Sequence, residues 1–467
     1  MACLRSSKLL CAGAIALFVW LLSTYVVFFH AVGTPSGLES KAGVGPGGSE
    51  HHHVLIGQAT SIRGTLNSPP SVAVDAAPPR ASGGEKEIVV KSPLEDDTAV
   101  GASDCSSKDS GPLCSYDVHM FYYGWYGTPE FDGKWLHWDH ERLPHWNPSI
   151  AKQHSRARHD PAKNDVGSTF YPKDKFYSSH DPKVVADHMV QIRRSGAGVL
   201  AVSWYPPGQH DNEGRESNAL IPLLLEKAAP KGLKIAFHVE PYKGRSPESI
   251  RRDIGYLLKT YGSHPAFYRE KESSLPLLYV YDSYLIETRA WGKLLRKGGE
   301  LSIRGTPLDA IMIGLVVEET HLSDIQKGGW DGFYTYFAAD KMSYGSTWRN
   351  FPSMAAFARR ERLVYIPSVG PGYDDVEVRP WNAQTTRDRR NGDYFREALG
   401  AARRATRRFV SITSFNEWHE GTNVETAIAG EKRQDGGRPY RDYGPKPGDE
   451  YKYLDLIREF LVTPLYK

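Results

Sequence analysis

Two glutamates, Glu417 and Glu420, stand three residues apart in the segment SFNEWHEG, which covers residues 414–421. Residues three apart share one face of a helix, whereas in a strand an odd spacing sends them to opposite faces. If the segment belongs to a strand, both carboxyl groups can act on one substrate only where the strand ends in a loop between them. Two carboxyl groups in an aromatic cleft are typical of glycosidic bond hydrolysis, in which one protonates the leaving group and the other acts as base or nucleophile. The alternative is an acidic pair on the surface or at a helix start.

From Tyr116 onward, short β-rich runs recur, and most are followed by a helical or turn-rich segment. The runs cover residues 118–127, 198–207, 233–242, 276–284, 309–319, 329–337, 363–372 and 408–418. Amphipathic stripes lie between several of them, formed by Val185, Met189 and Ile192; by Ile221, Leu224, Leu225 and Ala228; and by Ile254, Leu257, Leu258 and Tyr261. Near-continuous apolar runs are typical of strands buried on both faces of a parallel sheet. The pattern predicts an α/β fold, the (β/α)8 TIM barrel, with a doubly wound open sheet as the alternative.

Each predicted strand begins with apolar residues and ends with polar or aromatic ones. In such barrels the catalytic groups lie at the C-terminal ends of the strands, so these endings should converge on one mouth. Glu417 would end the extended part of the last strand and Glu420 would follow on the loop, where both carboxyl groups can face the mouth. The long segment between the first two strands should form a wall of the cleft. Its aromatic side chains include Trp135, His137, Trp138, His140, His145, Trp146 and Tyr171.

Histidines in two places have more than one interpretation. His137, His140 and His145 could form a metal site, but the acids that would complete it are not evident. Hydrogen bonding to sugar hydroxyls or packing is the favoured interpretation, and the sequence indicates neither a metal nor a cofactor. His238 and Glu240 share a strand face at period two, so they either enter the mouth together or form a structural pair.

Composition excludes several functional classes. The chain has 467 residues with a formal net charge of +3, which gives no sign of the clustered basic surface that binds nucleic acid. A P-loop, a dinucleotide fingerprint and a serine nucleophile elbow are all absent. A Golgi glycosyltransferase remains a rival interpretation, although the sequence contains no Asp-x-Asp motif for a sugar nucleotide.

The N-terminal segment predicts a membrane anchor. Residues 9–29 contain no charged residue. A helix over this segment would be long enough to cross a bilayer core of roughly 30 Å. Arg5 and Lys8 precede the segment, and no positive charge follows before Lys41. The positive-inside bias therefore makes residues 1–8 a cytosolic tail and the anchor type II, whereas a cleaved signal peptide is the competing interpretation.

The rest of the chain divides in two. Residues 30–115 are rich in Pro, Gly and Ser and predict a flexible lumenal stem. Residues 116–467 form the predicted catalytic domain, with ample length for one large core. Cys105 and Cys114 are the two cysteines beyond the anchor, and an oxidising lumen would allow a disulfide between them.

Several of these runs together resemble glycoside hydrolase family 99. They are FYYGWYG, SWYPP, FHVEPY, YVYDSY, GFYTYF, IPSVGPGY, RPWN and SITSFNEWHEGT, and the likeness extends in order over residues 116–463. The resemblance implies a retaining endo-glycosidase of the Golgi membrane that cleaves an α-1,2-mannosidic bond. Its implied substrates are glucosylated high-mannose N-glycans on glycoproteins, and no metal is implied.

The resemblance also implies a role for each glutamate. Glu417 corresponds to the base that takes the proton from the mannose 2-hydroxyl, whose oxygen attacks its own anomeric carbon and gives a 1,2-anhydro sugar. Glu420 corresponds to the general acid for departure of the leaving group and then to the base for the entering water. The usual retaining scheme differs, because there the enzyme supplies the nucleophile.

Substrate-binding residues follow from the same resemblance, with Tyr205 expected in the subsite for the terminal glucose. The full expected set is Tyr123, Trp125, Tyr126, His137, Trp204, Tyr205, His238, Glu240, Tyr242, Tyr281, Arg379, Trp381 and Asn416. Gly124 departs from the family, since vertebrate relatives usually have Ser there, and residues 423–432 are only loosely alike. Neither departure removes a catalytic group, but a catalytically weakened, glycan-binding paralogue stays an alternative.

Overall fold

The computed structural model describes residues 114–462 apart from residues 407, 429, 435 and 445. The predicted tail, anchor and nearly all of the predicted stem lie outside the described residues. In the described part, no helix has the length and apolar character that a bilayer span requires. The first strand begins at Ser115, one residue before the predicted boundary of the domain. Cys114 precedes it and is disulfide-bonded, while Cys105 lies outside the described residues.

The described strands form a single parallel sheet with the order β7-β6-β5-β4-β3-β2-β1-β9-β8. The strands are β1 (Ser115–Tyr122), β2 (Ala197–Trp204), β3 (Lys234–Val239), β4 (Leu277–Val280), β5 (Ile311–Leu315), β6 (Gly332–Tyr334), β7 (Val364–Ile366), β8 (Ser368–Val369) and β9 (Val410–Ile412). Every predicted β-rich run overlaps one of them or, in the case of residues 363–372, contains two, although β1 and β2 begin before their predicted runs. The predicted runs extend further than the strands, chiefly at their C-terminal ends.

The sheet closes into a barrel at Pro367, the single residue between β7 and β8. β7 pairs with β6, whereas β8 pairs with β9. Proline has no N–H to donate, so the backbone pairing is interrupted at this residue. Side-chain hydroxyls make hydrogen bonds beside it: Ser368 N–H donates to Thr335 Oγ1 (3.0 Å), and Ser368 Oγ accepts the Tyr336 N–H (2.7 Å). β7 and β8 are thus one interrupted strand of an eight-stranded barrel. The predicted (β/α)8 barrel is confirmed, and the open sheet is excluded.

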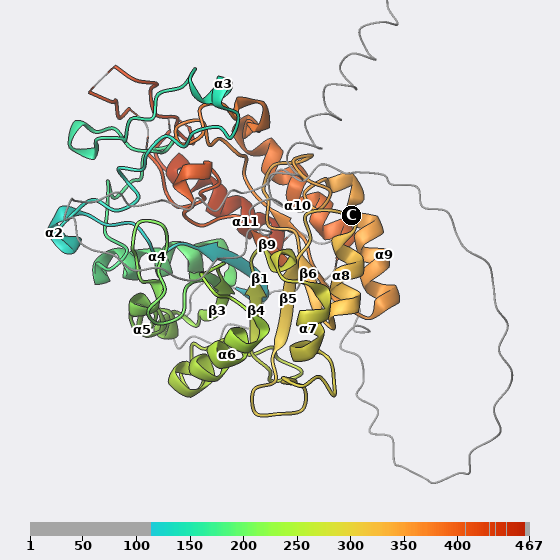
Figure 1. Ribbon diagram of the computed structural model, residues 1–467. Coiled ribbons are helices and arrows are strands. Elements are labelled where there is room, and N and C mark those ends of the chain that lie inside the picture. Colours follow the sequence, from blue (N-terminus) through green and yellow to red (C-terminus); the bar gives the residue numbers. More distant parts are fainter. Residues whose placement is uncertain (1–113, 407, 429, 435, 445, 463–467) are drawn as a thin grey trace, which may run out of the picture. The chain divides into compact units, whose positions relative to one another are not determined.

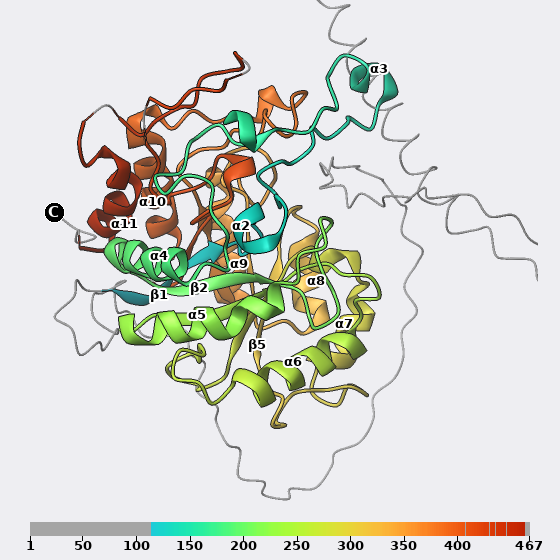
Figure 2. The same cartoon turned by 90° about the vertical axis from the view of Figure 1, so that its left-hand side faces the viewer.

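A helix follows each of the eight barrel strands and packs on its outside (Figures 1 and 2). The eight are α4 (Pro182–Ser195), α5 (Ile221–Ala228), α6 (Pro247–Tyr261), α7 (Thr288–Leu295), α8 (His321–Gly328), α9 (Phe351–Glu361), α10 (Asp393–Ala405) and α11 (Lys452–Val462). The predicted stripes on α4, α5 and α6 face the core, except that Leu258 is only partly buried.

Local sequence explains where these helices begin and end. Asp181 caps α4, because its side chain accepts the Lys183 N–H and Pro182 supplies a helical φ. Gly196 ends the helix at φ 84°, a left-handed conformation that suits glycine, and β2 begins at the next residue. Short connections of this kind place successive strands side by side in the barrel.

Three loops at the periphery are joined by a buried guanidinium. Arg433 pairs with Asp165 and donates to the Val166 carbonyl (2.9 Å) and the Ser168 carbonyl (2.8 Å). It also lies 3.4 Å from Glu377. The long β1–α4 segment, the segment after β8 and the segment before α11 are therefore tied together by one side chain.

Candidate active site

Glu417 and Glu420 lie on one tight turn after β9. The strand ends at Ile412, earlier than the predicted end near Trp418, because the following residues fold back on the chain: Ser414 N–H donates to the Thr422 carbonyl (3.0 Å). A 3₁₀ turn over Trp418–Glu420 follows, and the Glu417 side chain caps it by accepting the His419 N–H. Gly421 then reverses the chain at φ 58°. The change of geometry between the two acids that the sequence predicted is therefore present, although Glu417 caps a turn rather than ending a strand.

Residues from the end of β1 hold this turn. Asn416 accepts the Tyr123 N–H (2.8 Å) and donates to the Tyr123 carbonyl (2.7 Å). Tyr126 donates its hydroxyl to the Asn416 carbonyl (3.1 Å) and accepts the Trp418 N–H (3.1 Å). Hydrogen bonds thus join the segment after β1 to the turn that carries the two acids.

Burial dominates the electrostatics of the pair. Glu417 is 4% and Glu420 7% exposed, and a buried carboxyl favours its neutral form. Burial and then the charge of Glu420 raise the pKa of Glu417 well above its usual range, against the opposing Arg379. Burial raises the pKa of Glu420 to about 7, with Arg379 lowering it and Asp375 raising it. Because the two carboxyls interact, they titrate as a unit, and near neutral pH the unit readily holds a proton.

A guanidinium beside Glu420 is held in place by a second acid. Arg379 Nη1 lies 4.0 Å from Glu420 Oε1 and 3.1 Å from Asp375 Oδ2. Asp375 also accepts hydrogen bonds from Tyr373 (3.0 Å) and Asn382 (2.9 Å). Arg379 was predicted from the sequence, whereas Asp375 was not, because it lies outside any helix or strand and no motif marks it.

Several buried polar atoms around the turn have no hydrogen-bond partner among the described residues. They are Glu417 Oε2, His419 Nε2 and His137 Nδ1. Buried polar groups in native proteins are normally paired, so unpaired ones that gather around a pair of acids mark a place for water or for a hydroxyl-rich ligand. The other nitrogens of the two histidines are engaged, by the Gly167 carbonyl (2.9 Å) and by Asp211 (2.9 Å).

The predicted binding residues at the ends of β3 and β4 form a second cluster. Glu240 accepts a hydrogen bond from Ser203 (2.8 Å) and lies 3.4 Å from His238 Nδ1. Tyr281 contacts His238 edge to face, with centroids 5.3 Å apart. Tyr205 follows Trp204, whose carbonyl accepts the Glu240 N–H (3.0 Å), and burial and then Glu240 raise the pKa of Tyr205 well above its usual range. The paired arrangement of His238 and Glu240 is present, and both are buried.

Three other predicted binding residues have no free group directed at a ligand. Tyr126 and Trp204 expose none of their surface. The Tyr242 hydroxyl is occupied by Asp253 and Ser249 on α6. Their predicted substrate contacts stay predictions, and in the structure they support neighbouring elements. Residue type alone did not separate these aromatics from ones that line a cleft.

The histidines of the β1–α4 segment divide between two surroundings. The rings of His137 and His140 lie 5.8 Å and 4.8 Å from the ring of His419, and burial followed by His137 lowers the pKa of His140 to about 4. His145 instead stacks on Trp146 at 3.7 Å. Across the described residues, no group of three or more His, Cys, Asp and Glu side chains is placed to hold a metal ion.

Arg389 is a further residue of the site that the sequence did not predict. Its Nη2 donates to the carbonyls of Gly421 and Asn423 (both 2.8 Å). The guanidinium lies over the rings of Phe170 (4.0 Å) and Tyr453 (4.5 Å), where cation–π attraction replaces solvation. Arg389 therefore fixes the backbone directly after Glu420.

Arg389→Lys should lower kcat by about a hundredfold, because a displacement of roughly 1 Å at a catalytic group has an effect of that size. An ammonium keeps the charge but loses the planar fork that reaches both carbonyls. Steady-state kinetics would check this, with KM and the melting temperature close to those of the wild type. A variant that lost stability and kcat in parallel would show a purely structural role instead.

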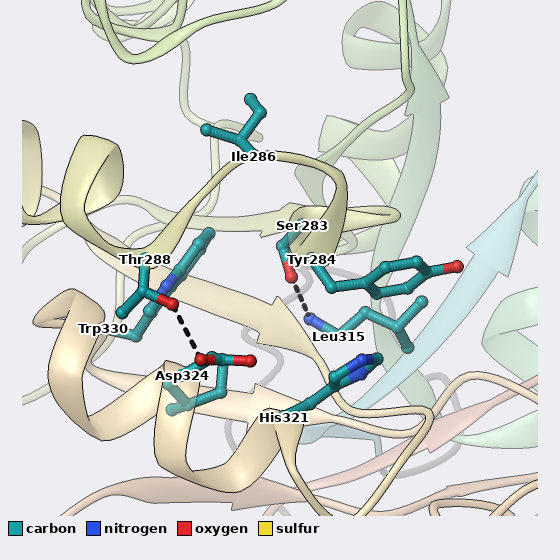
Figure 3. Close-up of a pocket in the computed structure, with 9 residues that line it drawn as sticks. Ser283, Tyr284, Ile286, Thr288, Leu315, His321, Asp324 and Trp330 are labelled. Atoms are coloured by element: carbon teal, nitrogen blue, oxygen red, sulfur yellow. Dashed lines mark hydrogen bonds between the residues drawn. The ribbon is translucent and has the colours of Figure 1, made fainter. Parts of the chain in front are cut away.

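A separate cavity of about 60 Å³ lies between the ends of β4 and β5 and helices α7 and α8 (Figure 3). Its polar groups are bonded to one another: Thr288 donates to Asp324 (2.8 Å), and Ser283 Oγ accepts the Leu315 N–H (2.9 Å). No unpaired buried polar atom of the described residues belongs to its lining. The candidate active site is therefore at the turn after β9 and not in this cavity.

Comparison with known proteins agrees with this assignment. The family model for glycosyl hydrolase family 99 matches residues 113–461. The chain is 48% identical over 353 residues to the glycoprotein endo-alpha-1,2-mannosidase of Xenopus laevis, covering 75% of this chain and 77% of that one. It is also 48% identical over 347 residues to the human glycoprotein endo-alpha-1,2-mannosidase-like protein, covering 74% and 75%.

A solved structure gives the same result. The GH99 endo-alpha-mannosidase from Bacteroides thetaiotaomicron is 40% identical and superposes with a TM-score of 0.68, covering 74% of this chain and 98% of that one. The family model, which extends over residues 113–461, includes the barrel strands and the turn that carries both glutamates. The chain belongs to glycosyl hydrolase family 99.

Proposed function

We propose that this protein is a retaining endo-acting glycoside hydrolase that cleaves the α-1,2-mannosidic bond linking a glucosylated mannose to N-glycan oligomannose. One observation supports it most: two buried, interacting carboxyl groups, Glu417 and Glu420, share one turn at the C-terminal end of a barrel strand. The names of the relatives, glycoprotein endo-alpha-1,2-mannosidase and its like protein, point to the same bond.

In the proposed first step, Glu417 takes the proton of the mannose 2-hydroxyl. The freed oxygen forms a bond to the anomeric carbon of its own ring, the bond from that carbon to the leaving oxygen breaks, and Glu420 gives its proton to the leaving oxygen. The step uses the form of the pair that holds one proton, placed on Glu420. The unpaired Oε2 of the ionised Glu417 is then available to accept a hydroxyl proton, and the raised pKa of Glu420 suits a general acid.

In the second step, water opens the 1,2-anhydro ring. Glu420, now ionised, takes a proton from the water as the water oxygen attacks the anomeric carbon. The bond from that carbon to the 2-oxygen breaks, and Glu417 returns its proton to the 2-oxygen. Both carboxyls return to their starting protonation states. The configuration of the anomeric carbon is inverted in each step, so it is retained overall. Arg379, 4.0 Å from Glu420, stabilises the ionised form between the steps.

The pH dependence should follow from the coupled pair Glu417 and Glu420, in which Glu420 is the proposed acid. A general acid works only while protonated, so kcat/KM should fall as pH rises through about 7, the pKa to which burial raises Glu420. Arg379→Gln removes the charge that lowers this pKa and should move the alkaline limb to higher pH. Kinetics from about pH 5 to about pH 9 would measure it, and an unshifted limb in the variant would assign the titration to another group.

The function itself is tested by digesting a monoglucosylated oligomannose N-glycan with the full-length protein. Release of glucosyl-α-1,3-mannose is expected, whereas loss of single glucose units would contradict the proposal. A glycan-binding paralogue without activity would bind the glycan and leave it intact. A glycosyltransferase would require a sugar nucleotide and would lengthen the glycan.

The proposal extends to location. Residues 9–29 would anchor the chain in the Golgi membrane as a type II protein, with residues 30–115 as a stem and the barrel in the lumen. The uncharged segment and the preceding Arg5 and Lys8 support this. Protease treatment of sealed vesicles should leave the barrel intact and remove a tag placed before residue 1.

A further inference from the structure

A cluster of three rings lies at the surface of the β1–α4 segment, and the proposed chemistry does not use it. Trp146 is among the few large apolar side chains exposed in the described residues, at 37%. His145 stacks on it with ring centroids 3.7 Å apart, and Trp381 meets it nearly at a right angle, 5.2 Å away. Apolar rings that gather at the surface, unlike single exposed ones, are a sign of a binding surface.

The cluster is held rigidly. Trp381 donates its indole N–H to the Leu143 carbonyl (2.9 Å), and Leu143 N–H donates to the Val378 carbonyl (2.7 Å). Asn147, the residue after Trp146 in the chain, caps the short helix α3 (Pro148–Ala151) with its side chain. A ring whose neighbours are already fixed loses little conformational freedom when a ligand stacks on it.

The position of the cluster relative to the acids indicates which part of a substrate it would meet. Trp381 follows Arg379 by two residues, which is at most about 7 Å of extended chain. Arg379 contacts Glu420, the residue that protonates the leaving group in the proposed mechanism. The cluster therefore adjoins the Glu420 side of the site. Tyr205 instead directly follows Trp204 at the end of β2, whose carbonyl accepts the Glu240 N–H (3.0 Å) at the end of β3.

We propose that His145, Trp146 and Trp381 form a stacking platform for the sugar residues on the leaving-group side, the oligomannose that stays on the glycoprotein. The inference rests on the proposed function, because that function defines which side leaves. Aromatic faces bind the apolar C–H faces of pyranose rings, and a platform on the side of the general acid suits an endo-acting enzyme with a large leaving group. Stacking tolerates different branches of the oligomannose, because the aromatic ring contacts the face of a sugar ring and not its individual hydroxyls.

Two substrates separate this role from catalysis. The first is the monoglucosylated oligomannose glycan. The second is glucosyl-α-1,3-mannosyl fluoride, in which a fluoride ion replaces the whole leaving sugar. In the full-length protein, Trp146→Ala should lower kcat/KM on the glycan about tenfold, equal to about 1.4 kcal/mol, mainly through KM. Hydrolysis of the fluoride should be unchanged.

Two further variants are controls. Trp146→Phe keeps an aromatic face and should retain most of the activity on the glycan. Phe131→Ala removes another exposed ring of the same segment, 50% exposed, and should leave both substrates unaffected. Unchanged kinetics on both substrates in Trp146→Ala, or equal losses on both, would overturn the platform.

Equilibrium binding provides a readout that does not depend on turnover. Calorimetry with oligomannose that lacks the glucosylated mannose, which is the leaving-group product, should show binding to the wild type that weakens about tenfold in Trp146→Ala. If the wild type binds this product but cleaves neither substrate, the proposed function fails while the platform stands. If the Trp146→Ala variant binds the product as tightly as the wild type, the platform fails whatever the activity.

Discussion

Glu420→Gln should reduce kcat on the glycan by roughly a hundred- to ten-thousandfold, the range typical for removal of a general acid or base. Glutamine keeps the size of the side chain but neither donates a carboxylic proton nor accepts one from water. Binding should survive, because the variant leaves Arg379 and the surrounding aromatic side chains in place. Initial rates and glycan binding, measured on the same preparation, check both halves of the expectation.

The same fluoride substrate separates the roles of the two acids. Fluoride leaves without a proton, so its release should suffer less from Glu420→Gln than glycan cleavage does. Glu417→Gln should impair both substrates alike, because the 2-oxygen must lose its proton in either case. Glu319, an exposed acid just after β5, provides the control, and Glu319→Gln should behave like the wild type. Equal losses for both substrates in Glu420→Gln would contradict its assignment as the general acid.

Arg433→Met should lower the free energy of unfolding by roughly 3–5 kcal/mol, the usual result of removing one partner from a buried ion pair. Only 2% of the Arg433 side chain is exposed, and its loss leaves Asp165 and Glu377 buried with fewer partners. His159, which bonds Asp165 (2.8 Å) and the Glu377 carbonyl (2.9 Å), cannot replace the two lost carbonyl contacts. Denaturant or thermal unfolding of the full-length protein would measure the change.

Arg438 offers a matched comparison. It lies in the same segment and is 3.6 Å from Glu377, but 58% of its side chain is exposed. Solvent screens such a pair, so Arg438→Met should change stability by at most about 1 kcal/mol. If both variants lost the same stability, the importance of burial at Arg433 would be refuted.

The order of the barrel elements could be predicted from the sequence, because apolar runs and amphipathic stripes depend on local pattern alone. Strand ends could not be predicted as well. The run at residues 276–284 contains Asp282, which the structure places at φ 47° after β4 has ended at Val280. Aromatic residues at such positions look like strand residues, although they lie on the turns that surround the mouth.

The candidate site was predictable where chemistry and spacing coincided, as at Glu417 and Glu420. Arg389 gave no local signal, because its partners are backbone carbonyls of a distant turn. Tyr126 and Trp204 were interpreted as binding residues, yet both are fully buried. Whether an aromatic ring lines a cleft or supports it depends on neighbours that only tertiary structure brings together.

The break at Pro367 matters for the behaviour of the protein at high concentration. A sheet that stops at a strand presents a row of free amides and carbonyls, on which another molecule can add a strand and begin to aggregate. Here the two parts of the interrupted strand are each bonded to a different neighbour, so the ring has no terminal strand. The strands of the barrel therefore do not need the charged residues or prolines that protect an exposed edge strand from pairing.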